Sequence, residues 1–128
     1  MACVKEIVAV NALEIRDTNA HTPATAGETT KNLFVDVHDC EMFTVYVDNQ
    51  LDQAVAVKAY HNRVKSTTKA IASGVDALTV ATVSQDARTF TPNNAGWLPW
   101  LYLQLECGSA PSSGSVTVYV IKFKRMRS

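Results

Sequence analysis

Residues 43–61, FTVYVDNQLDQAVAVKAYH, decide the fold of this 128-residue chain. Over 43–48 apolar side chains alternate with other residues, and the alternation resumes over 55–60 after a polar stretch. Period-two alternation is typical of a strand with one buried face, and the Asn and Asp residues between the runs favour a turn. We therefore expect residues 43–61 to form a β-hairpin. The side chains expected to face its core are Phe43, Val45, Val47, Val55, Val57 and Ala59.

The same alternation recurs along the chain, and helical periodicity is almost absent. The further strands expected are 4–10, 13–15, 33–37, 78–83, 101–107 and 115–123. Leu103 and Val118 are expected to join Val45 and Val57 in one core. Several short strands separated by Gly, Pro and Asn turns predict an all-β chain. The fold class expected is an antiparallel β-sandwich, jelly-roll-like.

The segments between these strands carry turn signals. Asp86 and Arg88 are expected to bracket a turn, with a brief extended piece at 89–91. Residues 92–96, PNNAG, form the strongest turn cluster in the chain. The polar and basic stretch 62–74 is compatible with a short strand or with one helical turn.

Length and composition predict a single domain over residues 1–128. The segment 17–31 is rich in Thr, Ala and Asn without periodicity, so we expect a mobile loop or arm there. No signal peptide is expected at the N-terminus, and no apolar run is long enough to cross a bilayer. Lys plus Arg and Asp plus Glu both number 12, so a dedicated nucleic-acid binder is not expected either.

No stretch of the sequence carries a catalytic or metal-binding pattern. Cys3, Cys40 and Cys107 are far apart and form no metal-ligand spacing, so reduced thiols are expected. His38 and Asp39 precede Cys40, yet neighbours on a strand point to opposite faces and do not converge on one substrate. We expect no enzymatic activity, no metal and no cofactor.

Aromatic residues gather on the strand faces opposite the expected core. They are Phe34, Tyr46, Tyr60, Trp100, Tyr102, Tyr119 and Phe123. A solvated outer face would carry mostly Thr, Lys and Ser. Three interpretations stand: loops that cover these rings, a subunit interface, where Tyr, Trp and Phe are enriched, or a platform that stacks on sugars.

Basic residues gather in two places. The C-terminal set is Lys122, Lys124, Arg125 and Arg127. The second set is Lys58, Arg63, Lys65 and Lys69. Such residues either form a solvated surface that protects an edge strand or contact an acidic partner.

Two stretches resemble small β-sandwich structural proteins of tailed bacteriophages. They are VYVDNQLDQAVAV (45–57) and GWLPWLYLQLECGSAPSSGSVTVYVIKF (96–123). In such proteins a strand ending in an Asn/Leu/Asp/Gln turn leads into a second strand, and a Pro-Ser-Gly loop precedes a Val-rich last strand. The matching residues are Asn49, Leu51, Asp52, Gln53, Ala110, Pro111, Gly114 and 116–120. The resemblance covers roughly residues 43–61 and 97–123.

The resemblance implies a non-enzymatic virion protein that decorates or cements the phage capsid. It implies a homo-oligomer, a trimer, that binds the major capsid protein, and a place in the virion after folding in the host cytoplasm. The alternatives are a tail or head-to-tail connector protein, or a carbohydrate-binding module that uses Trp97, Trp100 or Tyr102. The expected subunit-interface residues are Tyr119, Ile121, Phe123, Tyr102 and Trp100. The expected shell contacts are Lys122, Lys124, Arg125 and Arg127.

Overall fold

The computed structural model describes residues 2–22, 34–72, 78–92 and 96–125. Their strands are β1 (Ala2–Leu13), β2 (Val35–Asp36), β3 (Met42–Asn49), β4 (Val55–Asn62), β5 (Ile71–Ala72), β6 (Leu78–Val80), β7 (Ser84–Phe90), β8 (Trp100–Glu106) and β9 (Val116–Arg125). No helix occurs in these residues, as expected, and so none that could cross a membrane.

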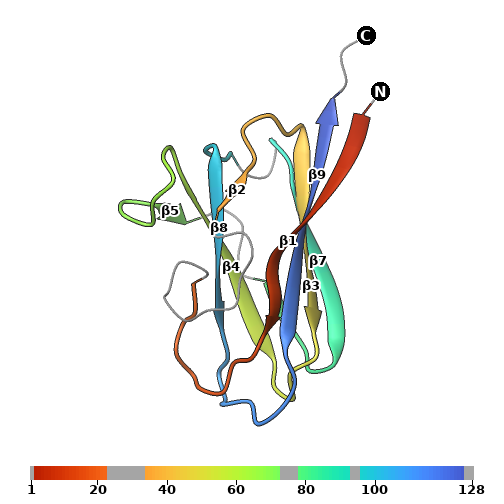
Figure 1. Ribbon diagram of the computed structural model, residues 1–128, viewed down its shortest axis with the longest axis vertical. Coiled ribbons are helices and arrows are strands. Elements are labelled where there is room, and N and C mark those ends of the chain that lie inside the picture. Colours follow the sequence, from red (N-terminus) through yellow and green to blue (C-terminus); the bar gives the residue numbers. More distant parts are fainter. Residues whose placement is uncertain (1, 23–33, 73–77, 93–95, 126–128) are drawn as a thin grey trace.

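The strands form two antiparallel sheets that pack face to face (Figure 1). Sheet A has the order β1-β9-β3-β7. Sheet B has the order β2-β8-β4-β5, with β6 also paired to β4. The architecture is therefore the antiparallel β-sandwich that the alternation predicts.

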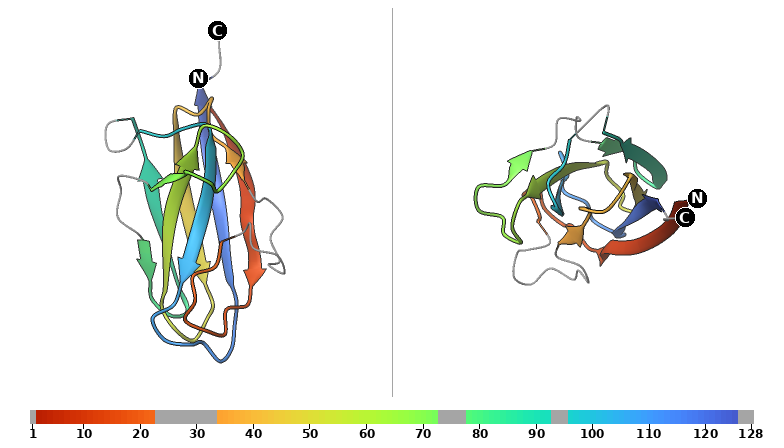
Figure 2. Two further views of the ribbon diagram at one scale, coloured as in Figure 1. Left: turned by 90° about the vertical axis from the view of Figure 1, so that its left-hand side faces the viewer. Right: turned by 90° about the horizontal axis from the view of Figure 1, so that it is seen from above.

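Strand pairing is nested along the chain. β1 pairs with β9, β2 with β8, β3 with β7 and β4 with β6. The chain thus folds back on itself around β5, and most connections cross from one sheet to the other (Figure 2). This is the connectivity of a jelly roll.

The expected hairpin at 43–61 is wrong, although its face assignments are right. β3 and β4 lie in different sheets, and the residues between them form a crossover. Asn49 is fully buried there, and its amide donates to the carbonyls of Gln53 at 3.0 Å and Val80 at 3.2 Å. The backbone N–H of Leu51 donates to the Asn49 side chain, and Leu51 fills the core. A turn rich in polar residues is therefore built around one buried amide and one buried leucine.

The crossover is tied to the loop between β8 and β9, and together these loops form what we call the closed end (residues 49–54 and 107–115). Gln50 N–H donates to the Ser115 carbonyl at 2.9 Å, and Ser112 N–H donates to Asp52 at 2.9 Å. Gly114 has φ +87°, and a Cβ there would lie 1.9 Å from the Gln50 carbonyl oxygen. Only glycine permits this approach.

The expected turn between Asp86 and Arg88 is also wrong. Residues 84–90 form β7, which pairs with β3 and places Arg88 opposite Val45. β7 is an edge strand whose residues are mostly exposed. Its side chains therefore need no apolar alternation, and the sequence pattern that marks the other strands is missing.

Other expected strands differ in extent. The segments 4–10 and 13–15 are replaced by one long β1, whose register shifts between Val8 and Val10 and again before Leu13. Only Val35 and Asp36 of the expected strand 33–37 pair, and Leu33 lies outside the described residues. The expected strand 78–83 ends at Val80. In the stretch 62–74, Asn62 ends β4 and Ile71–Ala72 form β5, while residues 73 and 74 lie outside the described residues.

Part of the expected arm lies against sheet B. His21 and Leu105 exchange backbone hydrogen bonds of 2.7 and 2.8 Å, so residues 17–22 are attached to the β8 edge. The remainder of the expected arm, 23–31, lies outside the described residues.

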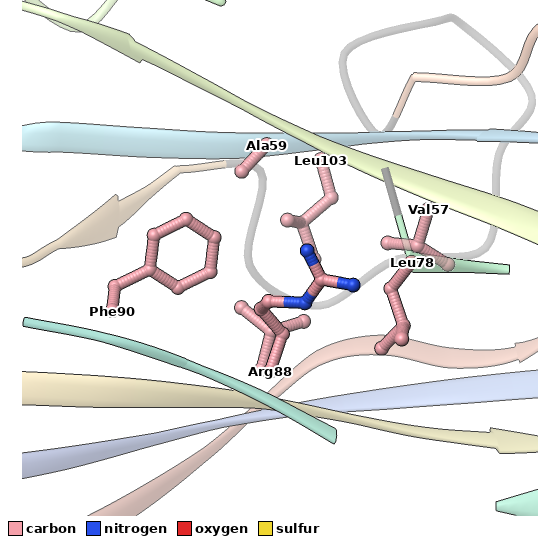
Figure 3. Close-up of a pocket in the computed structure, with 7 residues that line it drawn as sticks. Val57, Ala59, Leu78, Arg88, Phe90 and Leu103 are labelled. Carbon is pink, nitrogen blue, oxygen red and sulfur yellow. The ribbon is translucent and has the colours of Figure 1, made fainter. Parts of the chain in front are cut away.

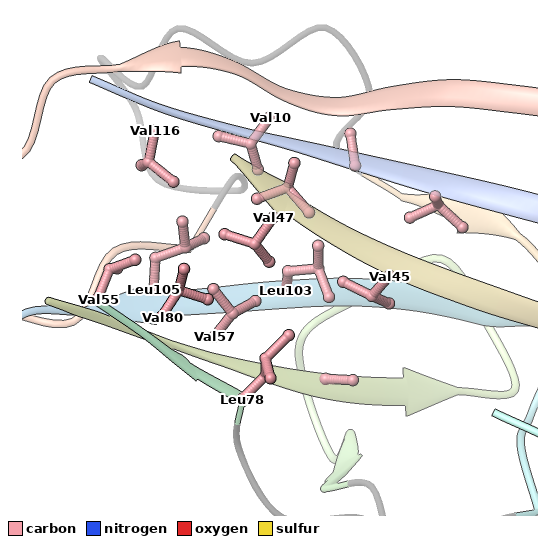
Figure 4. Close-up of a cluster of buried hydrophobic side chains, with 14 of the residues drawn as sticks. Val10, Val45, Val47, Val55, Val57, Leu78, Val80, Leu103, Leu105 and Val116 are labelled. Atoms are coloured by element: carbon pink, nitrogen blue, oxygen red, sulfur yellow. The ribbon is translucent and has the colours of Figure 1, made fainter. Parts of the chain in front are cut away.

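One hydrophobic core fills the space between the sheets (Figure 4). It contains Val45, Val57, Leu103 and Val118, which confirms the predicted core. Side chains from both inner faces contribute, as alternation in a two-layer sandwich requires.

Candidate binding surfaces

The outer face of sheet A carries three mixed rows of side chains, since antiparallel partners share a face. The rows, from β1 through β9 to β3, are Val4, Phe123 and Met42; Glu6, Ile121 and Thr44; and Val8, Tyr119 and Tyr46. Val4 is 60% exposed, and the rings of Tyr46 and Tyr119 lie 6.0 Å apart. Aromatic and aliphatic side chains thus predominate in these rows, on a face of sheet A that the other sheet does not cover (Figure 1).

On the outer face of sheet B, the aromatic side chains pack against one another and against Lys58. Tyr60 and Tyr102 stack at 5.2 Å, and Phe34 packs edge-on against Tyr102 at 5.7 Å. The Lys58 ammonium lies over the Tyr60 ring, at 5.5 Å from its centre. Burial raises the pKa of Tyr102, with Tyr60 adding to the effect. Stacked pairs of this kind contribute about 0.5–1.5 kcal/mol each beyond burial.

The expected interface residues therefore fall on opposite faces of the sandwich. Tyr119, Ile121 and Phe123 lie outward on sheet A, whereas Trp100 and Tyr102 belong to sheet B. Tyr102 is buried, and the structure brings only the three β9 residues into one surface.

The basic residues near the C-terminus are partly used within the fold. Lys122 follows Val116, Val118 and Val120 onto the inner face, is buried, and donates to the Asp36 carbonyl at 2.7 Å. Lys124 forms an ion pair with Asp39 at 2.8 Å, which lowers the pKa of that carboxyl. The Arg125 side chain and Arg127 lie outside the described residues. Shell contact by this set stays a prediction.

His38, Asp39 and Cys40 have separate partners. His38 bonds to Asp36 at 2.6 Å, while Asp39 pairs with Lys124. The Cys40 thiol is half-buried and free, and burial raises its pKa. Within the described ranges, no three His, Cys, Asp or Glu side chains come together in a way that could hold a metal ion.

A cavity between the sheets is lined by Val57, Leu78, Arg88 and Leu103 together with core neighbours (Figure 3). Its volume is about 10 Å³, and the Arg88 guanidinium lies among the apolar side chains. That volume is close to the minimum for one water molecule. The space therefore does not qualify as a ligand site.

A larger hollow lies at the end opposite the closed end, which we call the open end. A cavity of about 460 Å³ is lined by His61, Ile71, Ala72, Gly96, Trp97 and Leu98. A second, of about 400 Å³, shares Ile71 and Leu98 and adds Arg63 and Lys69. His61 is 4% exposed, and its Nε2 has no hydrogen-bond partner among the residues that the structure describes. The alternation through Val57 and Ala59 continues to His61, so this pattern is the sequence signal that places the imidazole on the inner face.

Comparison with known proteins shows similarity of fold. The chain matches no protein-family model and no curated protein. The SPBc2 prophage-derived protein YomS is 12% identical, with a TM-score of 0.54 over 97% of this chain and 96% of that chain. An infectious bursal disease virus structure (Gx strain) is 8% identical, with a TM-score of 0.48 over 97% of this chain and 32% of that chain. The tobacco streak virus coat protein is 8% identical, with a TM-score of 0.42 over 100% of this chain and 88% of that chain. YomS therefore shares the fold, and the two weaker similarities carry no argument.

Proposed function

We propose that this chain is a structural protein of a phage virion that decorates and stabilises the assembled capsid. The observation that carries the proposal is the outer face of sheet A, where aromatic and aliphatic side chains surround Ile121 and its row neighbours Glu6 and Thr44. A solitary domain has little reason to present such a surface, whereas interfaces are enriched in Tyr and Phe. The fold shared with a prophage-derived protein is in keeping with this role.

The surface on sheet A is proposed to hold the copies of a homo-oligomer together, with Tyr119, Ile121 and Phe123 at its centre. A trimer would present three identical contact sites to the major capsid protein. Weak single contacts then combine, because linked sites raise avidity by orders of magnitude. The shell is stabilised by mass action, since the protein binds the lattice and not its dispersed subunits.

The carbohydrate-binding alternative is less favoured by the geometry of its three rings. Trp97 packs edge-on against Phe43 at 5.0 Å and donates to the Val37 carbonyl. Lys65 lies over the Trp100 ring, and Tyr102 is stacked on Tyr60. A sugar platform needs ring faces open to the ligand. A tail or connector protein remains the second candidate, because it would use the same exposed sheet.

The proposal is tested by adding purified protein to shells that lack it and following shell melting. The wild type should form an oligomer by light scattering and raise the shell melting temperature. Ile121→Asp should dissociate the oligomer, because it replaces the central aliphatic side chain of the proposed interface by a second carboxylate beside Glu6, whereas Ala110→Asp in an exposed loop should not. A monomer that neither binds shells nor changes their melting would overturn the proposal.

A further inference from the structure

The loop between β4 and β5, residues 63–70, projects from the side of the sandwich at the open end (Figures 1 and 2). Asn62, at the end of β4, stabilises the conformation of this loop. Its buried side-chain amide donates to the carbonyls of Ser66 at 2.7 Å and Thr68 at 2.9 Å. The loop is thus a structured projection with its own hydrogen bonds. Its side chains are presented in a defined arrangement.

This part of the chain is positively charged. Residues 53–75 contain four Lys or Arg and no Asp or Glu, although the chain as a whole has zero net charge. Lys65 lies over Trp100. Arg63 and Lys69 are exposed, line the same cavity, and form no ion pair with any residue that the structure describes. Two unpaired cations therefore flank one hollow.

The two cavities at the open end meet at Ile71 and Leu98, and we call them together the groove. One half is apolar and contains His61 and Trp97; the other half contains Arg63 and Lys69. Ile71 is 59% exposed at their junction. A ligand that fits both halves needs an apolar group beside negative charge.

His61 adds a separate requirement. A buried imidazole nitrogen without a hydrogen bond costs free energy, and a ligand that supplies the bond recovers it. A hydroxyl group can donate or accept, so it suits either tautomer of the neutral ring. A tyrosine side chain combines the apolar body that this half of the groove accepts with such a hydroxyl.

We infer that the groove binds an extended acidic segment of a partner protein, with a tyrosine in the His61 half and carboxylates beside Arg63 and Lys69. The inference deepens the proposed function and rests on it for the partner's identity, a shell protein. It moves the shell contact from the C-terminal basic residues to the projecting loop. Lys122 and Lys124 already have partners within the fold.

The first test measures binding of the acetylated peptide Glu-Asp-Tyr-Asp-Glu by NMR titration at low salt. Arg63→Glu should weaken binding at least about fivefold, because it replaces attraction by repulsion. Lys5→Glu, the same charge change on exposed β1, should leave binding within about twofold.

A second peptide, with Phe in place of Tyr, tests the hydrogen bond to His61. The wild type should prefer the Tyr peptide by about 3–10-fold, the range expected for one net hydrogen bond. His61→Leu should bind both peptides equally, a result that a merely structural role for His61 would not produce. Absence of peptide binding, or equal weakening by Arg63→Glu and Lys5→Glu, overturns the inference.

Co-sedimentation with shells separates this inference from the proposed function. If the wild type and Arg63→Glu bind shells equally, the groove is not the contact and the inference fails while the proposed function stands. If the wild type ignores shells but binds the acidic peptide through Arg63, the proposed function fails and the groove remains a binding site. Loss of shell binding by Arg63→Glu, with Lys5→Glu unaffected, supports both.

Discussion

The closed and open ends of the sandwich are built on opposite principles. At the closed end, Asn49, Asp52 and Gly114 form contacts that tie two crossing loops together. At the open end, a charged loop projects and a groove is present, and the buried Nε2 of His61 meets no hydrogen-bond partner within the described ranges. The closed end connects β3 to β4 and β8 to β9, whereas the loops at the open end connect β4 to β5 and β7 to β8.

The closed end contributes hydrogen bonds that stabilise the fold, and the open end offers a groove for binding. Buried polar groups are normally hydrogen-bonded, and each exception calls for an explanation. The buried amides of Asn49 at the closed end and Asn62 at the open end are both hydrogen-bonded, whereas His61 Nε2 at the open end has no partner among the residues that the structure describes. We expect substitutions at the closed end to affect stability and substitutions at the open end to affect binding.

Gly114→Ala should give the largest effect, because it attacks the closest backbone approach at the closed end. The added Cβ would collide with the Gln50 carbonyl oxygen and would occupy a left-handed conformation. The two costs are about 1–2 kcal/mol for the conformation and about 1–3 kcal/mol for displacement of the neighbour. Chemical denaturation should show a loss of about 2–5 kcal/mol. Gly108→Ala, where a Cβ meets nothing within 4 Å, is the matched control.

Asn49→Ala should give the next largest effect. It removes the hydrogen-bond partner of the Leu51 N–H and of the Gln53 carbonyl in the crossover, and of the Val80 and Ala81 carbonyls at the end of β6. Leaving one buried polar group unsatisfied costs about 1–3 kcal/mol. The same substitution at exposed Asn11 should cost less than about 0.5 kcal/mol. Equal effects at the two positions would show that Asn49 does not organise the crossover.

His61→Leu should raise the stability of the protein, in contrast to the two substitutions at the closed end. It removes from the open end a buried polar group that has no hydrogen-bond partner among the described residues. We expect it to stabilise the protein by about 1 kcal/mol at neutral pH. Burial lowers the pKa of His61 below its usual value of 6.5. The unfolded chain therefore takes up the proton first, and the wild type loses stability as the pH falls below about 6.5.

The His61→Leu variant should lack the part of the acid-induced loss of stability that comes from protonation of His61. His21 and His38, with their carboxylate partners, are retained in both proteins and cancel in the comparison. Thermal melts of both proteins from pH 7.5 to 5 measure the difference. Parallel melting curves would mean that His61 finds a partner in solution.

Arg63→Glu should have the smallest effect on stability, less than about 0.5 kcal/mol, because the side chain is exposed. The same variant should lose binding to the acidic peptide. A stability loss above about 1 kcal/mol would show that Arg63 contributes to the stability of the fold. The open end would then not differ from the closed end in this respect.

The alternation in the sequence predicted which side chains are buried but not which strands pair. Val45 and Val57 alternate in the same way whether their strands are neighbours in one sheet or face each other across the core. Asn49 resembled a turn residue because the sequence does not show that its amide is buried.

The open end was harder to predict for a related reason. Lys122 continues the inward alternation of β9, yet a lysine is expected at the surface. Only the structure shows that the Asp36 carbonyl accepts a hydrogen bond from its ammonium group. β7 was missed because an edge strand needs no apolar face. The groove could not be predicted, since Ile71 and Leu98 meet only after β4 and β8 have paired.

The central position of β9 in sheet A has a consequence for biosynthesis. β9 lies between β1 and β3, and Ala12 bonds to Thr117 across 105 positions of chain. Contacts so distant in sequence form slowly, because a long loop must close before they add stability. A nascent chain that has not yet released residue 116 from the ribosome has β1 and β3 without the strand that joins them. Those open edges are prone to aggregation, so sheet A is completed only after translation of β9.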